Sequence, residues 1–112
     1  AKPFGIANGI RNPEPLWGDV IVSAVRASDG TGIIVTDQAI LDAVKLLAST
    51  ESILACPEGA STVAAAAQLK ESGFLRPDDV VVMVNTGSGL KYPQVLEQPQ
   101  LRRLRADEEI VA

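Results

Sequence analysis

A run of five consecutive apolar residues, VVVMV at positions 80–84, places the strongest constraint on the fold of this chain. A strand with one face in water alternates apolar and polar residues, whereas this run is apolar at every position. Continuous runs of this kind are typical of parallel strands that are covered on both faces. The run therefore predicts a buried strand in a parallel sheet.

Two further short apolar runs and three segments with helical periodicity precede this strand. Residues 32–36 and 52–56 are short apolar runs bounded by turn residues or proline, and we expect both to be strands. Helices are expected over residues 16–30, 37–48 and 59–69, the second capped by Asp37. The second helix should bury one apolar face, made of Ile40, Leu41, Val44, Leu47 and Ala48. The third is alanine-rich on all sides, which indicates burial between other elements.

The order helix, strand, helix, strand, helix, strand predicts the fold class. Alternation of this kind is typical of α/β units with right-handed crossovers. We therefore expect an α/β, three-layer architecture: a mostly parallel sheet with crossover helices. Three strands make a thin sheet, so the chain should be part of a larger one.

The 112 residues predict a single segment with three parts. Residues 1–15, rich in Gly, Pro and Asn, should form an extended lead-in, and residues 16–93 the α/β unit. Residues 94–112, which mix LRRLR with ADEE, should form a tail that is a short helix or frayed.

Composition excludes several classes of function. With 14 acidic and 10 basic residues the net charge is −4, which argues against nucleic acid or an anionic membrane as a partner. No apolar stretch approaches the roughly 20 residues of a membrane helix. The lone Cys56 indicates a reducing, cytoplasmic location. The absence of histidine removes His-based catalytic dyads and metal sites, so no metal is expected.

Candidate site residues follow the expected strands, because ligands of open α/β sheets bind at the carboxyl ends of strands. These ends are residues 36–37, 56–59 and 85–89, and the last two combine glycines with polar side chains. Each piece also has a purely structural interpretation. Glu58 suits the first turn of a helix, Cys56 suits a small buried site, and the TGSG loop suits a plain turn. Lys91 either meets a phosphate or is a surface lysine.

Longer motifs carry a resemblance to a known family. They are GIRNPEP, RASDG, IIVTDQAILDAVKLLA, CPEGASTVAAAAQLKESGFLRPDDVVVMV and NTGSGLKYP, in this order over residues 5–93. Together they resemble the C-terminal part of the threonine synthases, fold-type II pyridoxal-phosphate (PLP) enzymes of the tryptophan-synthase-β-like group. The most specific pieces are PEGA and TGSGLKYP.

The resemblance implies a carbon-oxygen lyase that converts O-phospho-L-homoserine and water into L-threonine and phosphate. It implies PLP as the cofactor of the complete enzyme, with this chain forming part of the large domain. Thr86 would approach the pyridine nitrogen, with Ser88 as the second candidate. The cofactor-binding residues implied are Thr86, Gly87, Ser88, Gly89, Cys56 and Glu58.

The chain departs from the family pattern in its lysines. Its four lysines are Lys2, Lys45, Lys70 and Lys91, and none stands in the motif of the family's Schiff-base lysine. A glycine-rich loop for the cofactor phosphate is also missing. We therefore expect no catalytic residue in this chain, no activity of the chain alone, and a partner in the N-terminal portion of the enzyme. The resemblance also implies an amino-acid substrate and a homo-oligomer.

Three alternatives remain open. The first is a fragment of a threonine or serine dehydratase, although GLKYP favours threonine synthase. The second is a non-catalytic ligand-binding or interaction module. The third, a nucleotide or flavin-phosphate binder that uses TGSG for an anion, lacks the acidic ribose-binding residue at the required spacing.

Overall fold

The computed structural model describes residues 4–95 of the chain. In this part, α1 (Gly18–Ala27), α2 (Asp37–Glu51) and α3 (Pro57–Glu71) are the α-helices. Short 3-10 helices lie at η1 (Asn8–Ile10), η2 (Gly89–Lys91) and η3 (Pro93–Val95). The three predicted helices are therefore confirmed. Most of the predicted tail, residues 96–112, lies outside the described residues.

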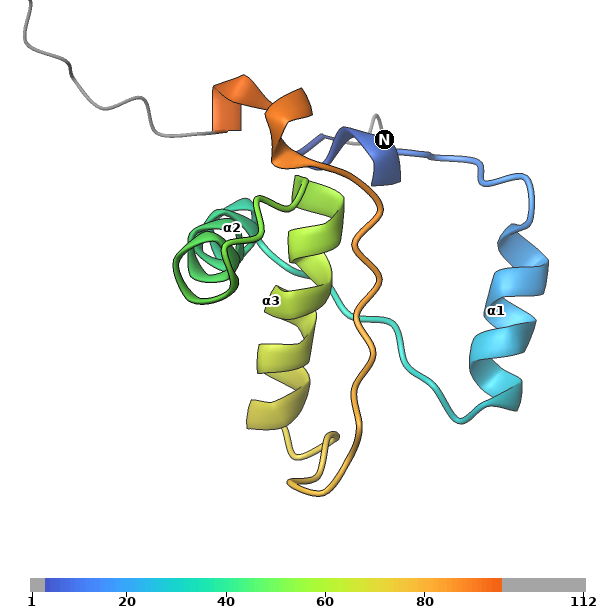
Figure 1. Ribbon diagram of the computed structural model, residues 1–112. Helices are drawn as coiled ribbons and strands as arrows, with labels where there is room; N and C mark the ends of the chain where they lie inside the picture. The colour runs from blue at the N-terminus through green and yellow to red at the C-terminus, as the bar shows by residue number, and fades with distance from the viewer. Residues whose placement is uncertain (1–3, 96–112) are drawn as a thin grey trace, which may run out of the picture.

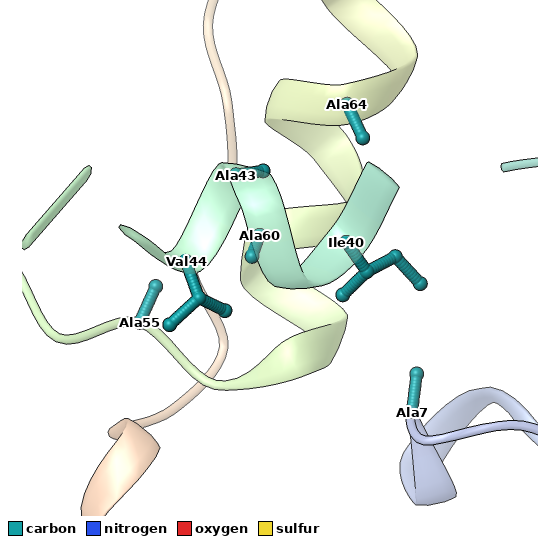
Figure 2. Close-up of a cluster of buried hydrophobic side chains, with 7 residues drawn as sticks. All are labelled: Ala7, Ile40, Ala43, Val44, Ala55, Ala60 and Ala64. Carbon is teal, nitrogen blue, oxygen red and sulfur yellow. The ribbon is translucent and has the colours of Figure 1, made fainter. Parts of the chain in front are cut away.

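Helices α2 and α3 pack against each other and form the core, while α1 stands apart from them (Figure 1). Figure 2 shows the buried side chains, which come from α2, α3, the connection between them and the N-terminal segment. They are Ala7, Ile40, Ala43, Val44, Ala55, Ala60 and Ala64. Five of the seven are alanines, so the helix backbones approach closely. A core of such small side chains removes little apolar surface from water.

The boundaries of α2 come from local chemistry. The Thr36 hydroxyl accepts a hydrogen bond from the Ala39 N–H at 3.2 Å, so Thr36 is the N-cap. The prediction of Asp37 as the cap was wrong by one residue, because the Asp37 carboxylate instead accepts from the Ile6 N–H at 3.2 Å. At the other end Ser52 adopts a left-handed conformation with φ of 57° and ends the helix.

Helix α3 begins at a proline, whose missing N–H costs nothing in the first turn. The Cys56 sulfur caps this end by accepting from the Gly59 N–H at 3.4 Å. Burial is confined to one face and the N-terminal turn, with Pro57, Gly59, Ala60 and Ala64 buried. The prediction that α3 is buried between other elements is therefore met on one face only within residues 4–95.

The structure contains none of the three predicted strands in the described part of the chain. The one β-bridge there is isolated and antiparallel, between Ala55 and Ser88. Residues 80–84 run in extended form beside α3 without backbone partners, and Val80 and Val82 are 93% and 84% exposed. The predicted parallel sheet is thus not formed within residues 4–95, because a strand needs the backbone groups of a neighbour whereas a helix satisfies its own.

Helix α1 has no buried residue, although its sequence is amphipathic. Trp17, Val20 and Ile21 each expose more than half of their side-chain surface. No helix within residues 4–95 has the length and apolar character needed to cross a membrane. Apolar surface is therefore left uncovered on α1 as well as on residues 80–84.

Candidate functional site

The loop of residues 85–89 lies antiparallel to residues 54–56, directly beside the N-terminus of α3. The Cys56 N–H donates to the Gly87 carbonyl at 3.0 Å, and the Gly89 N–H donates to the Leu54 carbonyl at 2.8 Å. A Cβ on Gly89 would lie 2.8 Å from the Ala55 carbonyl oxygen, so this close approach requires glycine. The two motifs that were expected to share a strand edge are thus in contact, although no sheet joins them.

Cys56 and Thr86 come together through their side chains. The Cys56 sulfur lies 3.8 Å from the Thr86 hydroxyl oxygen, and either group can donate. The thiol also lies within 3.9 Å of the Asn85 side-chain oxygen. Cys56 is buried, while the hydroxyl-bearing Thr86 is exposed at the surface of the loop. The pairing places a neutral hydroxyl where a ligand can reach it.

Glu58 joins three segments that are distant in sequence. One of its carboxylate oxygens accepts from the Gly9 N–H at 2.6 Å and from the Tyr92 hydroxyl at 2.7 Å. Glu58 itself lies in the first turn of α3, where the helix dipole favours a negative charge. The N-terminal segment and the chain after the glycine loop are thereby held to the same helix end.

These contacts shift the pKa values of Glu58 and Tyr92 in opposite directions. Burial by itself would raise the pKa of Glu58, but the hydrogen bonds from the Gly9 N–H and the Tyr92 hydroxyl outweigh it and lower that pKa. The hydrogen bond to Glu58 and the negative charge of that carboxylate raise the pKa of Tyr92, against a smaller opposing effect of Arg11. Glu58 is therefore an ionised acceptor at neutral pH, and Tyr92 a protonated donor.

A pocket of about 640 Å³ opens between these segments. This volume lies within the range of small-molecule sites, roughly 300–1,000 Å³. Of the six residues predicted to bind a cofactor, four line it: Cys56, Glu58, Thr86 and Gly87.

The other two predicted residues, Ser88 and Gly89, stabilise the conformation of the loop instead. The Ser88 hydroxyl accepts from the Leu90 N–H at 3.2 Å and caps η2, while Gly89 is buried against residues 54–55. Neither lines the pocket.

Sequence reasoning missed Gly9 and Tyr92 and left Lys91 open between a phosphate contact and a surface lysine; all three line the pocket. Tyr92 carried a usable signal, since it is the single tyrosine of the chain and lies three residues after the glycine loop. Gly9 had none, because its contact with Glu58 spans 49 residues.

Comparison with known proteins decides the family. Residues 2–87 match the family described as "Pyridoxal-phosphate dependent enzyme". The chain belongs to this family. It is 36% identical over 108 residues to the threonine synthase of Methanocaldococcus jannaschii, covering 96% of this chain and 25% of that protein. It is 40% identical over 102 residues to the threonine synthase of Methanosarcina acetivorans, covering 88% and 25%.

A third threonine synthase, from Synechocystis, is 36% identical over 116 residues, which cover this whole chain and 30% of that protein. The chain therefore spans about a quarter to a third of the length of these relatives. The resemblance inferred from the motifs is confirmed.

The pocket residues suit the cofactor that names the family. Thr86 offers an uncharged hydroxyl, Gly87 leaves the loop backbone without a side chain, and Ile10 and Val84 add apolar surface that suits a flat ring. A Cβ on Gly87 would lie 3.4 Å from the Cys56 sulfur, so a side chain there would crowd this wall. The donor set and the size of the pocket are compatible with PLP.

Proposed function

We propose that this chain supplies the pyridine-ring side of the cofactor pocket of a threonine synthase. The reaction would convert O-phospho-L-homoserine and water into L-threonine and phosphate. The observation that carries the proposal is the meeting of Thr86, Gly87 and Cys56 at one pocket, in a chain of the PLP-dependent family. The names of the relatives support the choice of reaction.

Thr86 is the proposed partner of the ring nitrogen. PLP, when bound, stabilises negative charge that develops on the substrate carbon, and the protein tunes the ring. A neutral hydroxyl donates a hydrogen bond without holding the nitrogen protonated, as a carboxylate would. Thr86 is preferred over Ser88 because Thr86 lines the pocket and Ser88 does not. Gly87 lets the loop backbone lie close to the ring, Gly89 lets the loop pack against residues 54–55, and Cys56 and Glu58 buttress the pocket.

The proposed partner of this chain is the N-terminal portion of the enzyme. Residues 80–84 would become a strand of a parallel sheet once neighbouring strands pair with them. The uncovered apolar surface of this segment and the 25% coverage of the first relatives support this arrangement. The chain would then be a single segment of a fold-type II large domain. An amino-acid substrate, a homo-oligomer and a cytoplasmic location belong to the same proposal.

A turnover assay of the full-length protein that carries this sequence tests the function. With PLP present, O-phospho-L-homoserine should yield equal amounts of threonine and phosphate. Deamination of threonine without phosphate release would instead establish the dehydratase alternative. Stable PLP binding with neither reaction would establish a non-catalytic binding module.

A further inference from the structure

We propose that Glu58 is a positioning residue that holds residues 8–10 and Tyr92 to the N-terminus of α3 and thereby sets the shape of the pocket. The proposal rests on the proposed function for the identity of the ligand, PLP. It assigns to Glu58 an action through its neighbours instead of a contact with the ring. Tyr92 becomes part of the pocket wall through the same contact.

The geometry of one carboxylate oxygen supports this role. It receives two short hydrogen bonds, of 2.6 Å from Gly9 and 2.7 Å from Tyr92. The donors lie 49 residues before and 34 residues after Glu58 in the chain. Hydrogen bonds to an ionised acceptor are about twice as strong as neutral ones. Glu58 thus connects three walls of the pocket at one atom.

Few other polar contacts hold these walls together. Among residues 4–95, the bond to Glu58 is the sole hydrogen bond between η1 and α3, and Glu58 is the sole partner of the Tyr92 hydroxyl. Gly9 fits closely, because a Cβ there would lie 3.0 Å from the same carboxylate oxygen. Loss of the carboxylate should therefore release both the N-terminal segment and Tyr92.

Thr86 makes none of these contacts. Its hydroxyl contacts Cys56, and the loop that carries it is held by backbone bonds to residues 54 and 56. Removing Glu58 should therefore alter the width of the pocket while the proposed ring-nitrogen partner stays in place. Because Glu58 and Thr86 make different contacts, the effect of Glu58 on the pocket can be measured apart from that of Thr86.

The experiment compares E58A, E58Q and Y92F with the control E71Q in the full-length protein. Glu71 is an exposed glutamate at the other end of α3. PLP affinity of E58A should fall about tenfold to a hundredfold, the effect of losing hydrogen bonds to a charged group. E58Q keeps an amide oxygen that accepts both bonds, so it should recover most of the affinity. Y92F should be intermediate, and E71Q unchanged.

A second measurement follows the tyrosine itself and needs no ligand. The difference in ultraviolet absorbance between wild type and Y92F isolates the titration of Tyr92. Its pKa should lie above the ordinary 10.0 in the wild type and fall toward that value in E58Q and E58A. If E58A does not fold, E58Q and Y92F supply the PLP affinities, and the titration of Tyr92 is compared between wild type and E58Q, each against its own Y92F counterpart.

Two results would overturn the proposal. One is E58A binding PLP as tightly as E71Q does, and the other is Tyr92 titrating identically in wild type and the Glu58 variants. A folded wild-type protein that binds no PLP would instead overturn the proposed function, and the Tyr92 titration would then decide the role of Glu58.

Discussion

Cys56 illustrates how one side chain serves both an element and a pocket. Its sulfur caps α3 through the Gly59 N–H and lies against the Thr86 hydroxyl. A thiol that is buried at a cap position, with no histidine anywhere in the chain to activate it, is suited to packing and not to nucleophilic attack. Its position brings residues 56 and 86 into contact although they are 30 positions apart in the sequence.

Substitutions at Thr86 test the assignment of the ring-nitrogen partner. Thr86→Ala should weaken PLP binding by about one neutral hydrogen bond, roughly 0.5–1.5 kcal/mol. Thr86→Ser should be mild because it keeps the hydroxyl, and Thr86→Asp should favour a protonated ring and side reactions such as dehydration. Equilibrium titration with PLP and its absorbance spectrum measure these effects. If Ser88→Ala weakened PLP binding and changed the spectrum while Thr86→Ala had no effect, Ser88 would be the partner of the ring nitrogen.

Glu58 should make the free energy of unfolding depend on pH in the acid range. Its pKa in the folded chain lies below the ordinary 4.5, so its contribution is complete above that value and is lost as the pH falls through the folded pKa. The difference in free energy of unfolding between wild type and Glu58→Gln should therefore be constant near neutral pH and shrink as the pH falls through 4.5 and then through the lower folded pKa. Urea unfolding at each pH measures it. A difference that stays constant over this range would contradict the lowered pKa.

At the scale of elements, helices and strands depend on different partners. Helix α2 has its own cap at Thr36 and closes its own hydrogen bonds, so it forms wherever its apolar face is covered. Residues 80–84 carry an equally clear strand pattern but find no neighbouring strand within residues 4–95. The part of this segment that docks through backbone bonds is the glycine loop at residues 85–89, which pairs with residues 54–56 just before α3.

Gly59→Ala should disrupt this docking. A Cβ at Gly59 would lie 2.9 Å from the Asn85 side-chain carbon and closer still to its oxygen, so the loop must shift. Overpacking of this kind costs about 1–3 kcal/mol. Thermal unfolding and faster hydrogen exchange at the Cys56 and Gly89 amides would report it. Gly32→Ala is the matched control, because a Cβ there meets no atom within 4 Å, and an equal loss in the control would refute the steric explanation.

At the scale of the whole molecule, small apolar side chains are buried while many large ones are exposed. The buried core consists mainly of alanines, while large apolar side chains on α1 and residues 80–84 face outward. Ile34, in the segment before α2, is 91% exposed. Apolar surface of this extent is typical of an interface with another chain segment.

The isolated 112-residue chain should therefore self-associate. The driving force is burial of the apolar side chains of α1 and residues 80–84, which the chain itself does not cover. Sedimentation velocity at low micromolar concentration measures the association. A single monomeric species across this concentration range would contradict the expectation, and a charged substitution at the exposed Val82 should reduce association.

The same isolated chain should form no specific covalent attachment to PLP. None of its four lysines stands in the family's cofactor-attaching motif, although Lys91 lines the pocket. Treatment with PLP and then borohydride, followed by peptide mass mapping, should show scattered, substoichiometric labelling. Stoichiometric labelling of one lysine would contradict this prediction, and Lys91→Gln would then show whether that lysine is the one in the pocket.

The sequence by itself determined the three helices, the family and four of the residues that meet at the pocket. Helical spacing and capping chemistry are local, so α1, α2 and α3 were predictable from the pattern. The motif order is enough for the family, and the motifs also predict four of the pocket residues, Cys56, Glu58, Thr86 and Gly87.

Only the tertiary structure decided how these parts are joined. The contact of Glu58 with Gly9 and Tyr92 spans 49 and 34 residues, and no local pattern encodes such a distance. The sequence also could not show that residues 80–84 lack a partner strand within the described chain. An apolar run specifies that a strand is to be covered, whereas what covers it depends on segments elsewhere in space.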